Sequence, residues 1–254
     1  MPAVGSYLYG FTHRGFEPGP DLRGLAGAPV RALPFGELAA VVSPHPVKPL
    51  MPLRSNLEPH HRVVRHVSDH AALVPAAFGH IVESDTDILG VLRANYRDIS
   101  DALARLSGKS EMGLKLSWTV PNIFDHMVRQ DRALRAVRDQ AFRGGRQPSL
   151  NERLEVGAAF EAALGRERDR LSRMLLAALD AVTCDVASTP PRSETVVYQG
   201  ALLVDRARVQ EFATRLHAAA GLFDATLTLD YSGPWPPYSF VRLRLQPAQP
   251  VAAA

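Results

Sequence analysis

Near its C-terminal end the chain reads Ser232-Gly233-Pro234-Trp235-Pro236-Pro237-Tyr238-Ser239-Phe240-Val241. Each of the three prolines has a fixed φ angle and also restricts the residue before it. We therefore expect Gly233, Trp235 and Pro236 to be extended, and the segment to form neither a helix nor a central strand. Such a stiff backbone holds large aromatic side chains at little cost in entropy, which suits a packing corner or a recognition surface.

The hydrophobic pattern around this segment predicts three strands and one helix. They are strands over residues 195–204, 223–231 and 239–245, and a helix over residues 205–219. Further upstream, Ser149 and Glu152 have the spacing of a capping box that opens a long helix. Together with a helix from Pro121 to Phe142, this long helix predicts a helical hairpin over about residues 121–183.

The first half of the chain alternates strands and helices in the same way. We expect strands over residues 6–11, 30–33, 38–43 and 112–118, and helices over about residues 56–73 and 84–107. Mixed helices and hairpin-like strands predict an α+β fold rather than a doubly wound parallel sheet. We place a domain boundary near Gly108, which gives an N-terminal α+β domain over residues 1–108 and a second domain over residues 109–254 that ends in a loose tail.

The composition indicates a globular protein. The chain has 254 residues, 46% hydrophobic and 22% charged, with a formal net charge of +3. Cys184 is the single cysteine, so no intrachain disulfide can form, and a reducing compartment is expected. The first residues lack the pattern of a signal peptide, and no apolar run reaches the length of a membrane span, so we expect a soluble cytoplasmic protein. The mixed run over residues 166–170 suggests a solvated helix face rather than a nucleic-acid patch.

Motifs for catalysis and cofactor binding are weak in this sequence. Gly108-Lys109-Ser110 resembles the end of a phosphate-binding loop, but the required earlier glycine is replaced by Leu103. Cys184 follows a predicted helix without a nucleophile signature. We therefore expect no enzymatic activity and no cofactor.

Four histidines gather on one predicted helix, namely His60, His61, His66 and His70. His66 and His70 are four residues apart and share a face, as zinc-binding pairs do, although a further ligand would be needed. The alternative is that these histidines are structural, either exposed or partly buried. If they are structural, their titration would make this surface sensitive to pH.

The proline-rich segment resembles the C-terminal signature of the gas vesicle F/L proteins (GvpF/GvpL). The matching residues are Gly233, Pro234, Trp235, Pro236, Pro237, Tyr238 and Phe240. Weaker matches follow the same order as in the family and cover nearly the whole chain. They are Tyr7-Leu8-Tyr9-Gly10, residues 39–43, Gly108-Lys109-Ser110-Glu111, residues 201–205 and Glu211-Phe212.

One segment departs from the family pattern. Where the family shows Pro-x-Arg-Phe-Gly-Thr, this chain has Pro75-Ala76-Ala77-Phe78-Gly79-His80. The arginine and the threonine are missing, so any ion pair or hydrogen bond that they make in relatives is absent here. Phe78 and Gly79 remain, which favours a packing role for the segment.

The resemblance implies a gas vesicle accessory protein without known enzymatic activity. It implies a two-domain α+β design, with a modified ferredoxin-like fold in the C-terminal domain and the helical hairpin as an elaboration. The implied partners are the hydrophobic major shell protein and other gas vesicle accessory proteins. The hypothesis that follows is an assembly factor that binds the shell protein, and the alternative is a minor structural component of the vesicle shell. For an assembly factor, the candidate binding surfaces are the proline-rich segment, with Trp235 and Tyr238, and the long helical hairpin. The alternative is that Trp235 and Tyr238 pack within the fold.

Overall fold

A computed structural model describes residues 3–246 of the chain. Contacts between Cα atoms divide these residues into two compact units. Unit 1 comprises residues 3–111, 205–207 and 233–246, and unit 2 comprises residues 112–204 and 208–232. The fold mixes helices with two antiparallel sheets. None of the helices within residues 3–246 has the length and apolarity that a membrane span requires.

Unit 1 is built on a five-stranded sheet. Its strands are β1 (Val4–His13), β2 (Arg31–Phe35), β3 (Leu38–Pro46), β4 (Val74–Pro75) and β5 (Ile81–Val82). The order is β2-β3-β1-β4, and β5 also pairs with β1. β1 is central, and every residue between its two ends is buried, because α1 (Arg54–His70) and α3 (Tyr96–Leu106) both pack against it. The expected strands near the start of the chain are confirmed, while the two short strands β4 and β5 were not predicted.

The single helix expected after Ser84 is in fact two helices, α2 (Asp85–Ala94) and α3. Ser84 caps α2 as predicted, because its side chain accepts a hydrogen bond from the Asp87 amide. The break falls at Asn95, whose side-chain amide donates to the carbonyl oxygen of Val91 over 2.7 Å. A polar side chain that bonds to nearby backbone competes with helix continuation, which explains the break.

Unit 2 contains most of a four-stranded sheet. Its strands are β6 (Lys109–Trp118), β7 (Asp185–Ser188), β8 (Val196–Asp205) and β9 (Leu227–Trp235), in the order β7-β8-β6-β9. The predicted alternation in β6 is confirmed, since Met112, Leu114, Leu116 and Trp118 are buried. The short edge strand β7 was not predicted.

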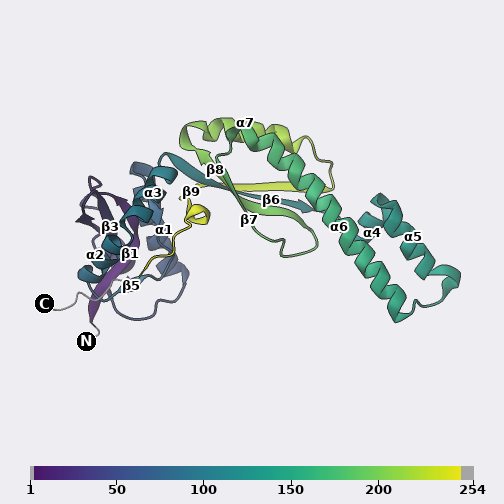
Figure 1. The fold of residues 1–254 in the computed structure, drawn as a ribbon, viewed down its shortest axis with the longest axis horizontal. Helices are drawn as coiled ribbons and strands as arrows, with labels where there is room; N and C mark the ends of the chain where they lie inside the picture. The colour runs from purple at the N-terminus through teal and green to yellow at the C-terminus, as the bar shows by residue number, and fades with distance from the viewer. Residues whose placement is uncertain (1–2, 247–254) are drawn as a thin grey trace. The chain divides into compact units, whose positions relative to one another are not determined.

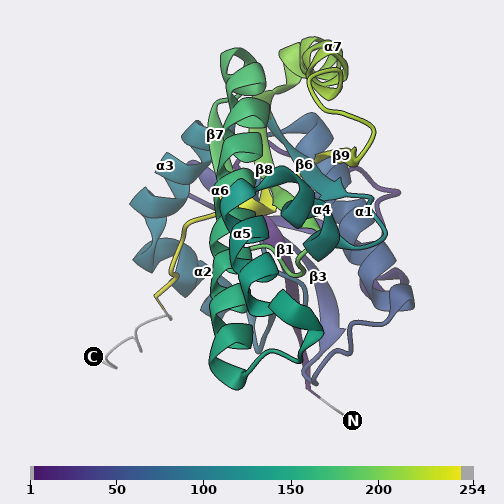
Figure 2. The ribbon, with the colours of Figure 1, turned by 90° about the vertical axis from the view of Figure 1, so that its right-hand side faces the viewer.

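The helices of unit 2 are α4 (Ile123–Gln130), α5 (Arg132–Ala141), α6 (Leu150–Leu179) and α7 (Val209–Ala220). The single helix expected over residues 121–142 is interrupted at Asp131, because its carboxylate caps α5 by accepting from the Leu134 amide over 2.8 Å. Figures 1 and 2 show α4 and α5 beside the first half of α6, with which both are in contact. The predicted capping box at Ser149 and Glu152 is present at the start of α6.

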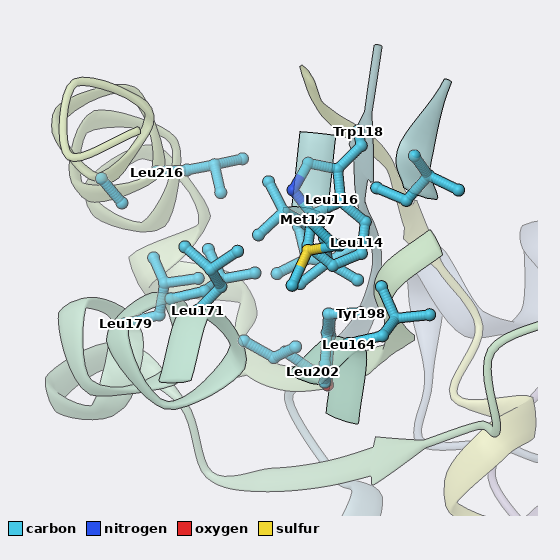
Figure 3. Close-up of a cluster of buried hydrophobic side chains, with 14 of the residues drawn as sticks. Leu114, Leu116, Trp118, Met127, Leu164, Leu171, Leu179, Tyr198, Leu202 and Leu216 are labelled. Carbon is cyan, nitrogen blue, oxygen red and sulfur yellow. The ribbon is translucent and has the colours of Figure 1, made fainter. Parts of the chain in front are cut away.

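The core of unit 2 lies between its sheet and two helices. Figure 3 shows Leu114, Leu116 and Trp118 of β6 directed toward the leucines of α6 and α7. Leu171 and Leu179 come from α6, and Leu216 comes from α7. Since α6 and α7 share one cluster with β6, both cover the same face of the sheet.

The strand predicted over residues 239–245 is wrong. Tyr238–Phe240 is a 3-10 helix, and residues 241–246 have no regular structure. The reason is that side chains provide hydrogen bonds to this backbone: Asn95 bonds both the amide and the carbonyl of Gln246, over 2.8 Å and 3.0 Å. Pro234 lies within β9 and Pro236 and Pro237 follow its end, so the prolines do not connect two strands. From residue 233 onward the described chain belongs to unit 1.

Candidate functional site

The proline-rich residues 233–240, called the strap here, combine a buried part with an exposed part. Pro236, Pro237 and Phe240 are buried, and Phe240 is 0% exposed. Trp235 is 46% exposed although its backbone is held between prolines. Gly233 has a φ of +117°, which only glycine adopts readily, and so departs from the extended backbone expected for it.

Two side chains of unit 1 fix the strap in place. The Glu111 carboxylate accepts hydrogen bonds from both the amide and the hydroxyl of Ser239, each over 2.8 Å. The Arg105 guanidinium donates to the carbonyl oxygen of Phe240 over 2.6 Å. Bonds that involve a charged partner are the stronger kind, so the strap is preorganised rather than loose.

A chain of hydrogen bonds runs from the strap into the core of unit 1. The Tyr238 hydroxyl lies 3.1 Å from Nε2 of His60, and the Tyr7 hydroxyl lies 2.9 Å from Nδ1 of the same ring. The Tyr7 hydroxyl also accepts from the Gly79 amide over 3.0 Å. Phe78 packs edge-on against His60, which agrees with the packing role expected for its segment. Both ring nitrogens of a nearly fully buried histidine are thus satisfied.

His60 is buried because it lies on the apolar stripe of α1. It precedes Val63, Val64 and Val67 at helical spacing, and these valines are fully buried against β1. Burial lowers the pKa of His60 from 6.5 to about 4, and the nearby His61 and His80 add to this effect. Burial also raises the pKa of Tyr7 to about 12. These groups are therefore neutral near pH 7 and serve as hydrogen-bonding partners rather than as an acid–base pair.

A cavity of about 720 Å³ lies beside the strap. Its lining residues come from α1, β6 and the strap, all within unit 1: His61, Arg62, Arg65, His66, Asp69, Glu111, Trp235, Pro236 and Tyr238. The α1 residues form a second stripe next to the one that carries His60, so one helix supplies both a core face and a cavity wall. Trp235, Pro236 and Tyr238 form the apolar wall of the cavity.

The charged wall of the cavity is partly neutralised. Arg65 and Asp69 are separated by 3.9 Å, and both side chains are more than half exposed, so this pair contributes little to stability. Burial lowers the pKa of His66, and His70 adds to the effect. The ring centroids of His66 and His70 lie 4.4 Å apart, and Nδ1 of His70 lies 2.7 Å from the carbonyl oxygen of His66. The cavity thus joins an aromatic wall to a wall of arginine and histidine.

The other sequence candidates lie elsewhere or do not converge. Within residues 3–246, no group of three histidine, cysteine or acidic side chains is placed to hold a metal ion. Cys184 is exposed. Lys109 begins β6 instead of following a strand as a phosphate-binding lysine would.

Sequence reasoning missed several residues of the site. Arg105 and Glu111 hold the strap but lie more than 100 residues before it, so no local pattern connects them. His60 could have been placed in the core from the sequence, because it continues the stripe of Val63, Val64 and Val67 toward the N-terminus. No comparable sequence pattern marks the residues of α1 that line the cavity.

Together these features define an α+β protein in which a proline-rich segment is held rigid beside a cavity. The chain belongs to the family described as gas vesicle synthesis protein GvpL/GvpF, whose model matches residues 5–242. This match includes the strap, the His60 network and every residue that lines the cavity.

Curated relatives and solved structures agree with this assignment. The chain is 28% identical over 241 residues to gas vesicle protein F of Streptomyces sp. (strain CB03234), covering 94% of this chain and 100% of that protein. It is 24% identical to gas vesicle protein F of Dolichospermum flosaquae, covering 93% and 97%. The crystal structure of GvpF from Anabaena sp. PCC7120 superimposes with a TM-score of 0.83 at 22% identity, covering 95% and 99%. That from Microcystis aeruginosa gives 0.79 at 23% identity, covering 94% and 99%.

Proposed function

We propose that this protein is a cytoplasmic accessory protein of gas vesicles that is needed for vesicle formation. In this role it binds the hydrophobic major shell protein, and other accessory proteins, while vesicles assemble. Family membership supports the connection to gas vesicles. The observation that supports binding is the cavity beside the strap, where Trp235 stays 46% exposed on a fixed backbone.

Binding at the strap costs little conformational entropy. A partner that buries Trp235 gains the transfer free energy of a large aromatic surface, at roughly 25 cal/mol per Å². Because prolines, Glu111 and Arg105 already hold the strap, little conformational entropy is lost on binding. Rigid, half-exposed tryptophans of this kind are frequent among the residues that dominate binding energy.

We further propose that the sheet of unit 2 is a modified ferredoxin-like fold. In chain order its main elements are β6, α6, β7, β8, α7 and β9, and the sheet order is β7-β8-β6-β9. This order supports the β-α-β-β-α-β pattern of that fold, with α4 and α5 inserted before α6. The proposed role requires neither catalysis nor a cofactor.

The function is tested by a deletion strain and by co-purification. Deletion should abolish or strongly reduce vesicles, and the affinity-tagged protein should retain the co-expressed major shell protein. Normal vesicles in the deletion strain would contradict the role in formation. If instead the protein stays on purified vesicles after a mild detergent wash, the role of a minor shell component is favoured.

A further inference from the structure

A second surface, separate from the strap, lies at the tip of the helical hairpin in unit 2. Three large apolar side chains are exposed there: Phe142 by 51%, Leu150 by 63% and Leu154 by 63%. Phe142 directly follows α5. The two leucines lie four residues apart at the start of α6, so they share a helix face. Exposed apolar side chains that cluster in this way often mark an interaction site.

Phe142 also lines a groove, to which α6 contributes Arg153, a neighbour of Leu154 in the sequence. This groove has a volume of about 620 Å³ and is lined by Phe124, Arg138, Asp139, Phe142, Arg153 and Val156. Its floor is apolar, because Val156 is buried and the ring of Phe124 packs on that of Phe160 at 5.4 Å. Arg138, Asp139 and Arg153 add charged groups to the lining, and Arg138 is paired with Asp139. The groove therefore combines an apolar floor with Arg153 as its unpaired charge among the described residues.

The charge of this region is slightly positive. From Arg138 to Glu155 the tip contains four arginines and three acids, a surplus of one. The arginines are Arg138, Arg143, Arg146 and Arg153. Within the described residues, Arg138 is paired with Asp139 and Arg146 with Glu152, while Arg143 and Arg153 have no ion-pair partner. The surface is thus complementary to carboxylates.

The tip is held rigid despite its exposure. Ser149 and Glu152 form the capping box of α6, and Arg146 donates to the same Glu152 carboxylate. The hydrogen bonds from Arg146 and Ser149 lower the pKa of Glu152 to about 2, so it stays charged under all ordinary conditions. At the other end of α5, Arg166 of α6 donates to Asp131 over 2.6 Å. The apolar side chains are therefore presented on a fixed frame, as docking requires.

From these observations we propose that the hairpin tip is a docking surface for an acidic amphipathic helix of a partner protein. The apolar face of that helix would cover Leu150, Leu154 and Phe142, and its carboxylates would meet Arg143 and Arg153. A second copy of this chain is disfavoured, because two tips of the same positive charge repel one another. The hollowed apolar floor favours a helix over a flat anionic membrane surface. This surface acts independently of the strap.

The test uses the full chain and a labelled synthetic helix of about 20 residues, with leucines at helical spacing and glutamates on either side. A control peptide carries lysines in place of the glutamates, and vesicles of phosphatidylglycerol provide the lipid control. Fluorescence anisotropy should show binding of the acidic peptide and not of the lysine peptide. Leu154→Ser and Arg153→Glu should each weaken it at least about tenfold, which is about 1.4 kcal/mol.

Matched control variants come from the same unit. Leu222→Ser changes a leucine that is 54% exposed at the end of α7, and Arg192→Glu changes an exposed arginine in a loop. Both should bind the acidic peptide like the wild type, and circular dichroism should show that all four variants are folded. Equal binding of both peptides, no binding of the acidic peptide at about 1 mM, or binding of vesicles alone would overturn the proposal. So would sedimentation of a dimer that Leu154→Ser dissolves.

Discussion

At the residue scale, His60 links the strap to the core of unit 1 through hydrogen bonds. It bonds Tyr7 on one side and Tyr238 on the other, and its ring stacks on Tyr9. A buried polar network of this kind is stable only when each member is satisfied. Here every nitrogen of the ring has a partner, so the motif tyrosine of the strap has a structural role in addition to any contact with a partner protein.

The lowered pKa of His60 predicts a specific dependence of stability on pH. The unfolded chain binds a proton on this histidine near pH 6.5, whereas the folded chain does so only near pH 4. Stability is therefore full above pH 6.5 and falls as the pH drops toward 4, by roughly 3 kcal/mol at most. Denaturant titrations at pH 7 and pH 4.5 should show a smaller loss for His60→Gln than for the wild type. An exposed histidine, changed in His217→Gln, should leave the loss as it is, and an unchanged loss in His60→Gln would contradict the prediction.

The bond between the strap and His60 can be removed without changing the packing. Tyr238→Phe deletes only the hydroxyl that lies 3.1 Å from Nε2 of His60, and leaves that nitrogen unsatisfied. We expect a loss of about 1–2 kcal/mol in the free energy of unfolding. Tyr231→Phe serves as the control, since Tyr231 is 57% exposed, and it should be neutral. If both variants were equally stable, the network would not hold the strap.

At the element scale, helix caps determine how the hairpin is built. Ser149 and Glu152 start α6, Asp131 starts α5, and Asn122 starts α4 by accepting from the Asp125 amide. The capping box of α6 was predictable because its two residues are adjacent to a long apolar stripe. The break at Asp131 was not, because helical periodicity continues across it and the polar cap decides the outcome.

Removing the cap of α6 is expected to destabilise unit 2. Ser149→Ala loses the hydrogen bond to the Glu152 amide and part of the anchor for its carboxylate. A loss of about 1 kcal/mol is expected, which corresponds to a fall of about 2–4 °C in the melting temperature of a chain of this size. Ser172→Ala lies inside the same helix and should not lower the melting temperature. A Ser149→Ala variant as stable as the wild type would contradict the prediction. It would show that packing against α5, without the cap, is enough to hold the start of α6.

Elements with strong local patterns were predicted well, and those that depend on distant partners were not. β1, β6 and α6 follow from alternation or helical periodicity. Residues 239–245 were expected to form a strand from their local hydrophobic pattern. Instead, Asn95 and Arg105, far away in the sequence, bond the backbone of Gln246 and Phe240. Similarly, the proline segment identified the family, but only the structure revealed Glu111 and the cavity beside it.

At the scale of the whole molecule, the chain forms two units whose residues are not contiguous in sequence. Residues 233–246 complete unit 1, and their side chains include Phe240 in its interior. The division into domains over residues 1–108 and 109–254 stays a prediction, which limited proteolysis can test. Independent domains should yield fragments that begin or end near Gly108, and cleavage confined to other sites would contradict this division.

The central claim is that the protein binds the major shell protein through the cavity beside the strap. The most direct measurement is the affinity of the purified protein, as wild type, Trp235→Ala and Tyr231→Ala, for the major shell protein in mild detergent. Tyr231 is an exposed aromatic residue on the same strand, outside the cavity lining, and its variant is the matched control. We predict that Trp235→Ala weakens binding by at least 2 kcal/mol, roughly 30-fold, and that Tyr231→Ala leaves it unchanged. A folded Trp235→Ala variant that binds as tightly as the wild type would contradict the claim.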